Sequence, residues 1–219
     1  MLYSPTTGPR TINQRGGMIQ THAREHSARV VMMPGWQGSG PDHWQSIWSS
    51  EISHTSSVEQ DNWEDPNRSR WIESLDRAVL QQRKPVVLVA HSLGCLTVAH
   101  WAGLNSYPIV AAFLVAPPNV LGPDACCRAI QGFSAIPRQK LRFPSLVVAS
   151  ENDPYASIEW TNRLAKDWGS DFINVGRAGH INVQSGHGSW PEGRCLLAGL
   201  MDSALRTSDS RVRADIVER

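Results

Sequence analysis

The sequence predicts an α/β fold in three layers, with a mainly parallel sheet of about six strands and helices on both of its faces. Short apolar segments rich in β-branched residues alternate along the chain with segments that are apolar at helical spacing. Within the short segments the apolar residues are consecutive, which is typical of strands covered on both faces. This alternation, over a chain of 219 residues, indicates a single domain.

Six segments are the expected strands. Residues 86–90 carry the strongest signal, because five apolar residues follow one another without alternation, and we expect them in the middle of the sheet. Residues 56–60 carry the weakest. In chain order the expected strands are residues 29–33, 56–60, 86–90, 109–116, 145–150 and 171–175.

Helices are expected between these strands, each with one apolar side. The first places Trp44, Ile47, Trp48 and Ile52 on one face, and we interpret its two tryptophans as core-facing. In chain order the expected helices are residues 42–52, 68–83, 95–103, 155–168 and 191–205.

The stretch 119–142 interrupts the alternation. It holds several glycines and prolines and predicts at most one helix, near residues 125–130. Connections of this kind often carry a cap or a substrate loop, and its role is left open.

The two ends of the chain differ from the domain, which we expect to span residues 28–205. Residues 1–27 are polar and lack the apolar core of a secretory signal, so we interpret them as a flexible leader. Their lack of acidic residues before Glu25 also fits a transit peptide, and Met18 is an alternative start. Residues 206–219 are charged, and we expect a loose tail.

Composition limits the kind of partner. The chain has 21 Lys and Arg against 20 Asp and Glu, with no basic stripe, so nucleic acid and anionic membrane surfaces are not expected partners. No apolar run is long enough to cross a membrane. We expect a small-molecule substrate, and the sequence does not indicate a protein partner.

The four cysteines indicate neither zinc nor disulfides. Cys95, Cys126, Cys127 and Cys195 form no C-x-x-C pair, and two of them are adjacent. Reduced thiols are the simplest interpretation, so we expect a cytoplasmic protein without a metal or cofactor.

Ser92 occupies a position with chemical meaning. It stands between the strand 86–90 and the helix 95–103, in the sequence His-Ser-Leu-Gly. A serine at a sharp strand-to-helix turn is held above the end of the sheet, and the next backbone N–H, that of Leu93, points at the same space. The match to G-x-S-x-G fails by one methyl group, because Ala90 replaces the first glycine. Taken alone, the motif fits an ordinary helix N-cap serine equally well.

Two further loops supply an acid and a base. Asp153 follows the strand 145–150, and His180 follows the strand 171–175. The chain order Ser, Asp, His is that of α/β-hydrolases and differs from the orders in other serine hydrolase folds. A turn-forming role before Pro154 is the alternative for Asp153.

Other acids and histidines fit these roles less well. Asp124, Asp167 and Asp171 do not directly follow a buried strand, and His187 lies farther from its strand than His180 does. We expect His91 to point away from the nucleophile.

The loop after the first strand is glycine-rich. It does not match a dinucleotide site, because Pro41 and Asp42 stand where a helix should begin. In a hydrolase this loop supplies a second oxyanion donor, and Gly35 would permit the bend that presents the Trp36 N–H.

At these residues the chain resembles the small serine hydrolases of the α/β-hydrolase superfamily grouped with retinoblastoma-binding protein 9 and the bacterial YdeN-type proteins. The resemblance covers most of residues 29–203 and rests on V-V-M-M-P-G-W-Q-G-S-G-P-D-H-W-Q, V-L-V-A-H-S-L-G-C, L-V-A-P-P, S-E-N-D-P-Y and A-G-H-I-N-V-Q-S-G-H-G-S-W-P-E-G. It implies a minimal single-domain α/β-hydrolase with Ser92, Asp153 and His180 as catalytic triad.

Four more residues are candidates for the surroundings of the site. His43, Asn182, His187 and Trp190 either line the substrate pocket or order the loop that carries His180. Short polar residues and glycines are typical of turns, which favours loop support for the last three.

These observations predict a serine hydrolase of carboxylesterase type that cleaves a small ester, thioester or amide through an acyl-enzyme on Ser92. The first alternative is a hydrolase-fold binding protein with little turnover, because a fold does not guarantee an activity. The second is an acyltransferase, which would use the same residues.

Overall fold

The structure is a computed structural model, which describes residues 28–122 and 128–217. The side chains of residues 128, 129 and 208–217 are not described. The expected leader, residues 1–27, lies outside the described residues, as do residues 125–127 of the expected helix 125–130, whereas residues 128–130 lie in a 3₁₀-helix.

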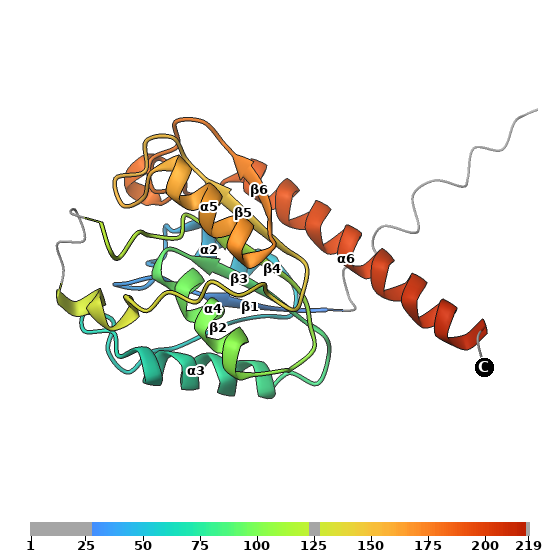
Figure 1. Cartoon of the computed structure of the whole chain (residues 1–219). Helices are drawn as coiled ribbons and strands as arrows, with labels where there is room; N and C mark the ends of the chain where they lie inside the picture. Colours follow the sequence, from blue (N-terminus) through green and yellow to red (C-terminus); the bar gives the residue numbers. More distant parts are fainter. Residues whose placement is uncertain (1–27, 123–127, 218–219) are drawn as a thin grey trace, which may run out of the picture.

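Six parallel strands form one sheet in the order β2-β1-β3-β4-β5-β6. Strand β3, which holds the apolar run recognised in the sequence, lies in its middle (Figure 1). The strands are β1 (Arg29–Met33), β2 (Thr55–Ser57), β3 (Val86–His91), β4 (Ile109–Val115), β5 (Ser145–Ala149) and β6 (Asp171–Asn174). The prediction of an α/β fold with a parallel sheet is confirmed.

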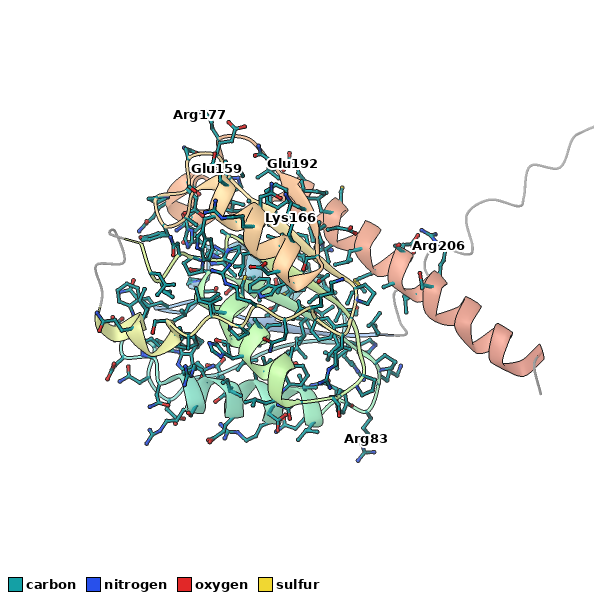
Figure 2. All side chains as sticks on the ribbon, viewed as in Figure 1. Arg83, Glu159, Lys166, Arg177, Glu192 and Arg206 are labelled. Carbon is teal, nitrogen blue, oxygen red and sulfur yellow. The ribbon has the colours of Figure 1, made fainter. Side chains whose placement is uncertain are left out.

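In the described residues, five α-helices and two 3₁₀-helices lie between the strands or follow the last one. They are α2 (Trp44–Glu51), α3 (Arg68–Leu80), α4 (Leu93–Leu104), η1 (Arg128–Phe133), α5 (Ile158–Trp168), η2 (Val183–Ser185) and α6 (Pro191–Val217). Side chains fill the space between helices and sheet, whereas charged side chains such as Arg83, Arg177 and Glu192 point outward (Figure 2). No described helix is both long enough and apolar enough to span a bilayer.

Each face of the sheet has its own apolar core. Helices α3, α4 and α5 cover one face, where Trp71, Leu96 and Leu164 belong to the same apolar cluster as Leu88. Helices α2 and α6 cover the other face. Successive residues of β3 enter opposite cores, as expected for a strand buried on both sides.

The two tryptophans of α2 are core residues, as predicted. Trp44 and Trp48 are fully buried and pack against the sheet with Phe113 and Trp190. The indole N–H groups donate to the backbone carbonyls of Ile181 and Ser189. Helix α2 is thereby connected to the segment that follows β6.

Helix boundaries lie within three residues of the prediction, except at the end of the last helix. That helix does not end at residue 205 but continues to Val217, so the expected tail is helical as far as this residue. No Gly or Pro follows Gly199 to end it, and Arg206 donates to Asp202 one turn earlier. Helix α5 begins at Ile158, because the Ser157 side chain caps it by accepting from Trp160 N–H.

Candidate active site

Ser92 lies at a strained turn above the sheet. Strand β3 ends at His91, α4 begins at Leu93, and Ser92 between them has φ of 53°. This left-handed backbone is rare for a residue with a Cβ. The Ser92 N–H donates to the Val115 carbonyl at the end of the neighbouring strand β4, which fixes the turn against the sheet.

Two glycines make room for this turn. A Cβ on Gly94 would collide with the backbone carbonyls of Met33 and Pro34, at the end of β1. A Cβ on Gly35 would lie 2.8 Å from the Ser92 Cβ. The small residue after the serine is therefore needed because the loop after β1 lies against the turn.

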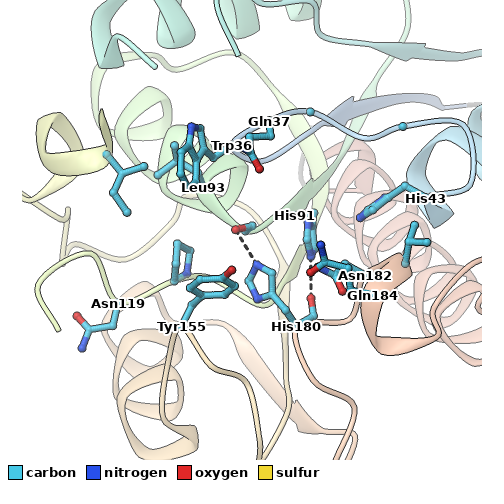
Figure 3. A pocket seen from close by; sticks show the side chains of 16 residues that line it. Trp36, Gln37, His43, His91, Leu93, Asn119, Tyr155, His180, Asn182 and Gln184 are labelled. Atoms are coloured by element: carbon cyan, nitrogen blue, oxygen red, sulfur yellow. Dashed lines mark hydrogen bonds between the residues drawn. The ribbon is translucent and has the colours of Figure 1, made fainter. Parts of the chain in front are cut away.

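Ser92, His180 and Asp153 form a continuous chain of hydrogen bonds. The distance from Ser92 Oγ to His180 Nε2 is 2.9 Å (Figure 3). The distances from His180 Nδ1 to the Asp153 carboxylate oxygens are 2.9 and 3.0 Å. Because a carboxylate only accepts, Nδ1 carries the hydrogen and Nε2 accepts from the serine hydroxyl. The three candidates from three separate loops thus meet at the carboxyl end of the sheet.

Short-range turns and cross-loop bonds place Asp153 and His180. The Asp153 carboxylate also accepts from Tyr155 N–H, so this residue forms a turn and contacts His180 at once. The Asn152 side-chain oxygen accepts from Gly179 N–H, and Ser150 Oγ accepts from Ala178 N–H. The loops after β5 and β6 are therefore joined directly beside the histidine.

His91 does not point away from the site, so that expectation is wrong. Its Nε2–H donates to the backbone carbonyl of His180 at 2.9 Å, and the two rings lie 4.9 Å apart between centroids. The strained backbone at Ser92 leaves His91 on the side of the loop after β6, where that carbonyl accepts its hydrogen. Burial, and then the nearby His180 and His43, hold the pKa of His91 well below its usual range.

His43 lies in the same row of rings, 4.8 Å from His91 between centroids. It precedes α2 and caps it, because its Nδ1 accepts from Gln45 N–H. Burial, followed by proximity to His180, lowers the pKa of His43 to about 4. Both His43 and His91 are therefore neutral at neutral pH.

The two residues expected to supply oxyanion donors lie at the same pocket as Ser92. Trp36 and Leu93 line one pocket with Ser92, and their N–H groups donate to no partner in the part of the chain that is described. The loop that carries Trp36 is anchored from outside the pocket. The Trp36 indole N–H donates to the Glu64 carbonyl, and the Gln37 backbone N–H donates to the Trp63 carbonyl.

The pocket is an open cavity of about 260 Å³ around Ser92. Of the four residues expected either to line it or to support the loop, His43 and Asn182 line it. His187 and Trp190 do not. His187 contacts Ser185 Oγ and the Trp190 ring, and Trp190 is buried against Trp48. Residues 128–217 and 28–122 contain no cluster of side chains that could hold a metal ion.

The sequence signals for the wider site were uneven. Two residues that the sequence did not indicate, Tyr155 and Asn119, also line the pocket. The Tyr155 ring packs edge-on against the His180 ring, with 4.5 Å between centroids. A local signal existed for Tyr155, because it lies two residues after Asp153. Asn119 had none, since the stretch that holds it matches no regular pattern.

The comparisons with known proteins agree with this geometry. A family model described as serine hydrolase matches residues 30–199. A putative YdeN-like hydrolase from Pectobacterium atrosepticum is 29% identical, with a TM-score of 0.76 over 85% of this chain and 99% of that one. No curated protein matches the sequence.

More distant structures share the fold. The ydeN gene product of Bacillus subtilis is 18% identical, with a TM-score of 0.68 over 80% of this chain and 99% of that one. A monoacylglycerol lipase from Paleococcus ferrophilus is 12% identical, with a TM-score of 0.61 over 81% and 95% of the two chains. Because the family model spans most of the described domain, the chain belongs to the serine hydrolase family, as a small α/β-hydrolase of the YdeN-like kind.

Proposed function

We propose that this serine hydrolase cleaves a small ester, thioester or amide through an acyl-enzyme on Ser92, in the manner of a carboxylesterase. The observation that carries the proposal is the unbroken hydrogen-bond chain from Ser92 through His180 to Asp153. A serine hydroxyl is a weak nucleophile unless a base takes its proton, and His180 Nε2 is placed to do so at 2.9 Å.

In the first half-reaction, Ser92 Oγ attacks the substrate carbonyl carbon while its proton passes to His180 Nε2. The carbonyl π electrons move onto oxygen, and the resulting oxyanion accepts hydrogen bonds from the Trp36 and Leu93 N–H groups. As the tetrahedral intermediate collapses, His180 gives the proton to the leaving alcohol, thiol or amine. The acyl group stays on Ser92.

In the second half-reaction, His180 takes a proton from water, and the hydroxide oxygen attacks the acyl carbon. Collapse releases the carboxylic acid and returns the proton to Ser92 Oγ. Asp153 keeps the imidazole in the Nδ1–H tautomer and stabilises the imidazolium that forms twice in each cycle.

The surroundings suit this chemistry. The side chains of His180 and Asp153 are 8% and 3% exposed, so their interaction is shielded from water. The Tyr155 ring against His180 and the Asn152 bond to Gly179 limit the movement of the base. The cavity size favours a small substrate.

Labelling with a fluorophosphonate probe tests the proposal. We expect the wild type to be labelled and to hydrolyse 4-nitrophenyl acetate, and Ser92→Ala and His180→Ala to lose both activities. Failure of the folded wild type to react would overturn it and favour a binding role. Labelling together with faster acyl transfer to an added alcohol than to water would favour an acyltransferase.

A further inference from the structure

The pocket around Ser92 has two chemically different sides. Figure 3 shows Trp36, Leu93 and Tyr155 on one side of the bond between Ser92 and His180, with His43, Asn182 and Gln184 on the other. The first side is mostly apolar and also includes Pro118 and Ile130, with Asn119 at its edge. We call the second side the polar arm, which consists of Gly38, Gly40, His43, Asn182, Val183 and Gln184, together with Gln37, which lies beside Trp36 at the boundary between the two sides (Figure 3).

The polar arm offers hydrogen bonds without offering charge. Its polar side chains are three carboxamides and one imidazole, its two glycines offer only backbone groups, and Val183 is its apolar side chain. The imidazole Nε2 of His43 is buried and has no hydrogen-bond partner among the described residues. Gln184 is exposed and has no side-chain hydrogen bond to the described residues, so its amide is available to a ligand. Asn182 is held in place, because its side-chain oxygen accepts from Ser185 N–H.

The imidazole is fixed as a neutral group. His43 is 5% exposed and uses Nδ1 to accept from Gln45 N–H, so its hydrogen is on Nε2. A proton on Nδ1 would break the helix cap. It would also add positive charge beside His91 and His180. Geometry alone therefore keeps this ring from serving as a cation for a bound anion.

The side chains of the polar arm provide no charge. All residues of the polar arm are described, and none is Lys, Arg, Asp or Glu. The Glu64 carboxylate accepts from Gln37 Nε2 at 3.2 Å, but it is exposed and does not line the pocket. A charged substrate group would lose water at the buried His43 end of the arm without gaining a counter-charge there.

From this arrangement we infer that the substrate carries an uncharged hydrogen-bonding group, such as a hydroxyl or carboxamide, on the half that enters the polar arm. The inference rests on the proposed function of the same pocket. It narrows the substrate class to neutral esters, thioesters or amides with one apolar and one polar, uncharged end.

Isosteric substrates test this inference. The probes are 4-carbamoylphenyl, 4-carboxyphenyl and 4-amidinophenyl acetate, which place a neutral, an anionic and a cationic group at one position. A second trio carries the same groups on the acyl half, as 4-nitrophenyl esters of para-substituted phenylacetic acids. For each ester, kcat/KM is divided by the rate of its own alkaline hydrolysis, which corrects for differences in chemical reactivity between the esters. In at least one trio we expect the neutral member to be preferred about 10-fold over both charged members, because an unpaired charge is costly to desolvate.

Two variants locate the effect. Gln184→Lys and Gln184→Glu place opposite charges at one exposed position of the polar arm. In the trio that shows the preference, we expect Gln184→Lys to favour the carboxylate and Gln184→Glu to favour the amidinium, each by about 3- to 5-fold, the size of a solvent-exposed ion pair. The inference is overturned if neither trio prefers its neutral member, or if both variants change the ratio of carboxylate to amidinium equally.

A binding measurement separates this inference from the proposed function. Ligand-observed NMR of Ser92→Ala protein with the same six esters ranks their binding without turnover. Tighter binding of the neutral esters supports the inference even if the wild type hydrolyses none of them, a result that would remove the proposed function alone. Equal or weaker binding of the neutral esters overturns the inference even if the wild type is an active esterase.

Discussion

His91 and His180 are joined from side chain to backbone, because the His91 Nε2–H donates to the His180 carbonyl oxygen at 2.9 Å. The bond connects the residue before Ser92 to the loop that carries its hydrogen-bond partner. Both residues are buried, at 5% and 7% exposure, so water does not compete for that carbonyl. The position of the His180 ring relative to Ser92 therefore depends on His91.

We expect His91→Leu to lower the rate of fluorophosphonate labelling and kcat by about 10-fold or more, with KM little changed, because small displacements of a catalytic base are costly. His91→Gln should recover most of the rate, since its Nε2–H can reach the same carbonyl. Thermal melts of both variants control for stability. If His91→Gln is as slow as His91→Leu at equal stability, His91 has no positioning role.

The strained backbone at Ser92 predicts a trade between stability and activity. Glycine tolerates φ of 53° without the cost of a Cβ. Ser92→Gly should therefore be more stable than Ser92→Ala by about 1 kcal/mol, a rise in Tm of about 2–4 °C for a domain of this size. Both variants should be unlabelled. Equal melting temperatures would show that the turn stores no strain.

The approach of the loop after β1 to Ser92 predicts a second sensitive position. A methyl group on Gly35 would lie 2.8 Å from Ser92 Cβ and 3.0 Å from the His91 carbonyl oxygen, so the loop must shift. Gly35→Ala should lower esterase activity about 10- to 100-fold by moving the Trp36 N–H away from the developing oxyanion.

Gly199→Ala is the control for this change. Gly199 lies in α6, does not line the pocket, and a Cβ there meets nothing within 4 Å. We expect this variant to retain activity within about 3-fold, the range of ordinary surface substitutions. Equal losses of activity in the two variants would mean that the contact between Gly35 and Ser92 is not what matters.

The parts of the structure that local patterns predicted are those encoded within a few residues. The consecutive apolar residues of β3 indicated a central strand, and a serine directly after it indicated a turn above the sheet. Ser92, Asp153 and His180 were found without any contact information, because the carboxyl ends of parallel strands meet at one edge.

The parts that were missed depend on contacts between distant segments. Asn152 accepts from Gly179, which lies 27 positions later, and nothing local to either residue indicates that bond. His91 was assigned the wrong direction for the same reason, since its partner is 89 positions away. The length of α6 is a different case, because a local signal for it existed. No Gly or Pro follows Gly199, so the sequence contains no helix-ending residue before the C-terminus.

The lowered pKa of His43 predicts how stability depends on pH. Its pKa is about 4 in the folded protein and 6.5 as a reference for the unfolded chain. Between these values the unfolded state binds a proton that the native state does not. The contribution of His43 to the free energy of unfolding is therefore fully present above pH 6.5. It falls as the pH drops toward 4, by up to about 1.4 kcal/mol per pH unit. His91 acts in the same direction.

His43→Asn isolates this contribution, because the Asn side chain can still accept from Gln45 N–H as a helix cap but does not titrate. Urea unfolding at pH 7 and pH 5 should show a loss of stability on acidification that is smaller in the variant by about 1–2 kcal/mol. Between pH 7 and pH 8 the difference in free energy of unfolding between the wild type and His43→Asn should stay constant, because the His43 ring is then neutral in both the folded and the unfolded state. Identical losses between pH 7 and pH 5 would contradict burial of a neutral His43 and would also weaken the description of the polar arm as uncharged.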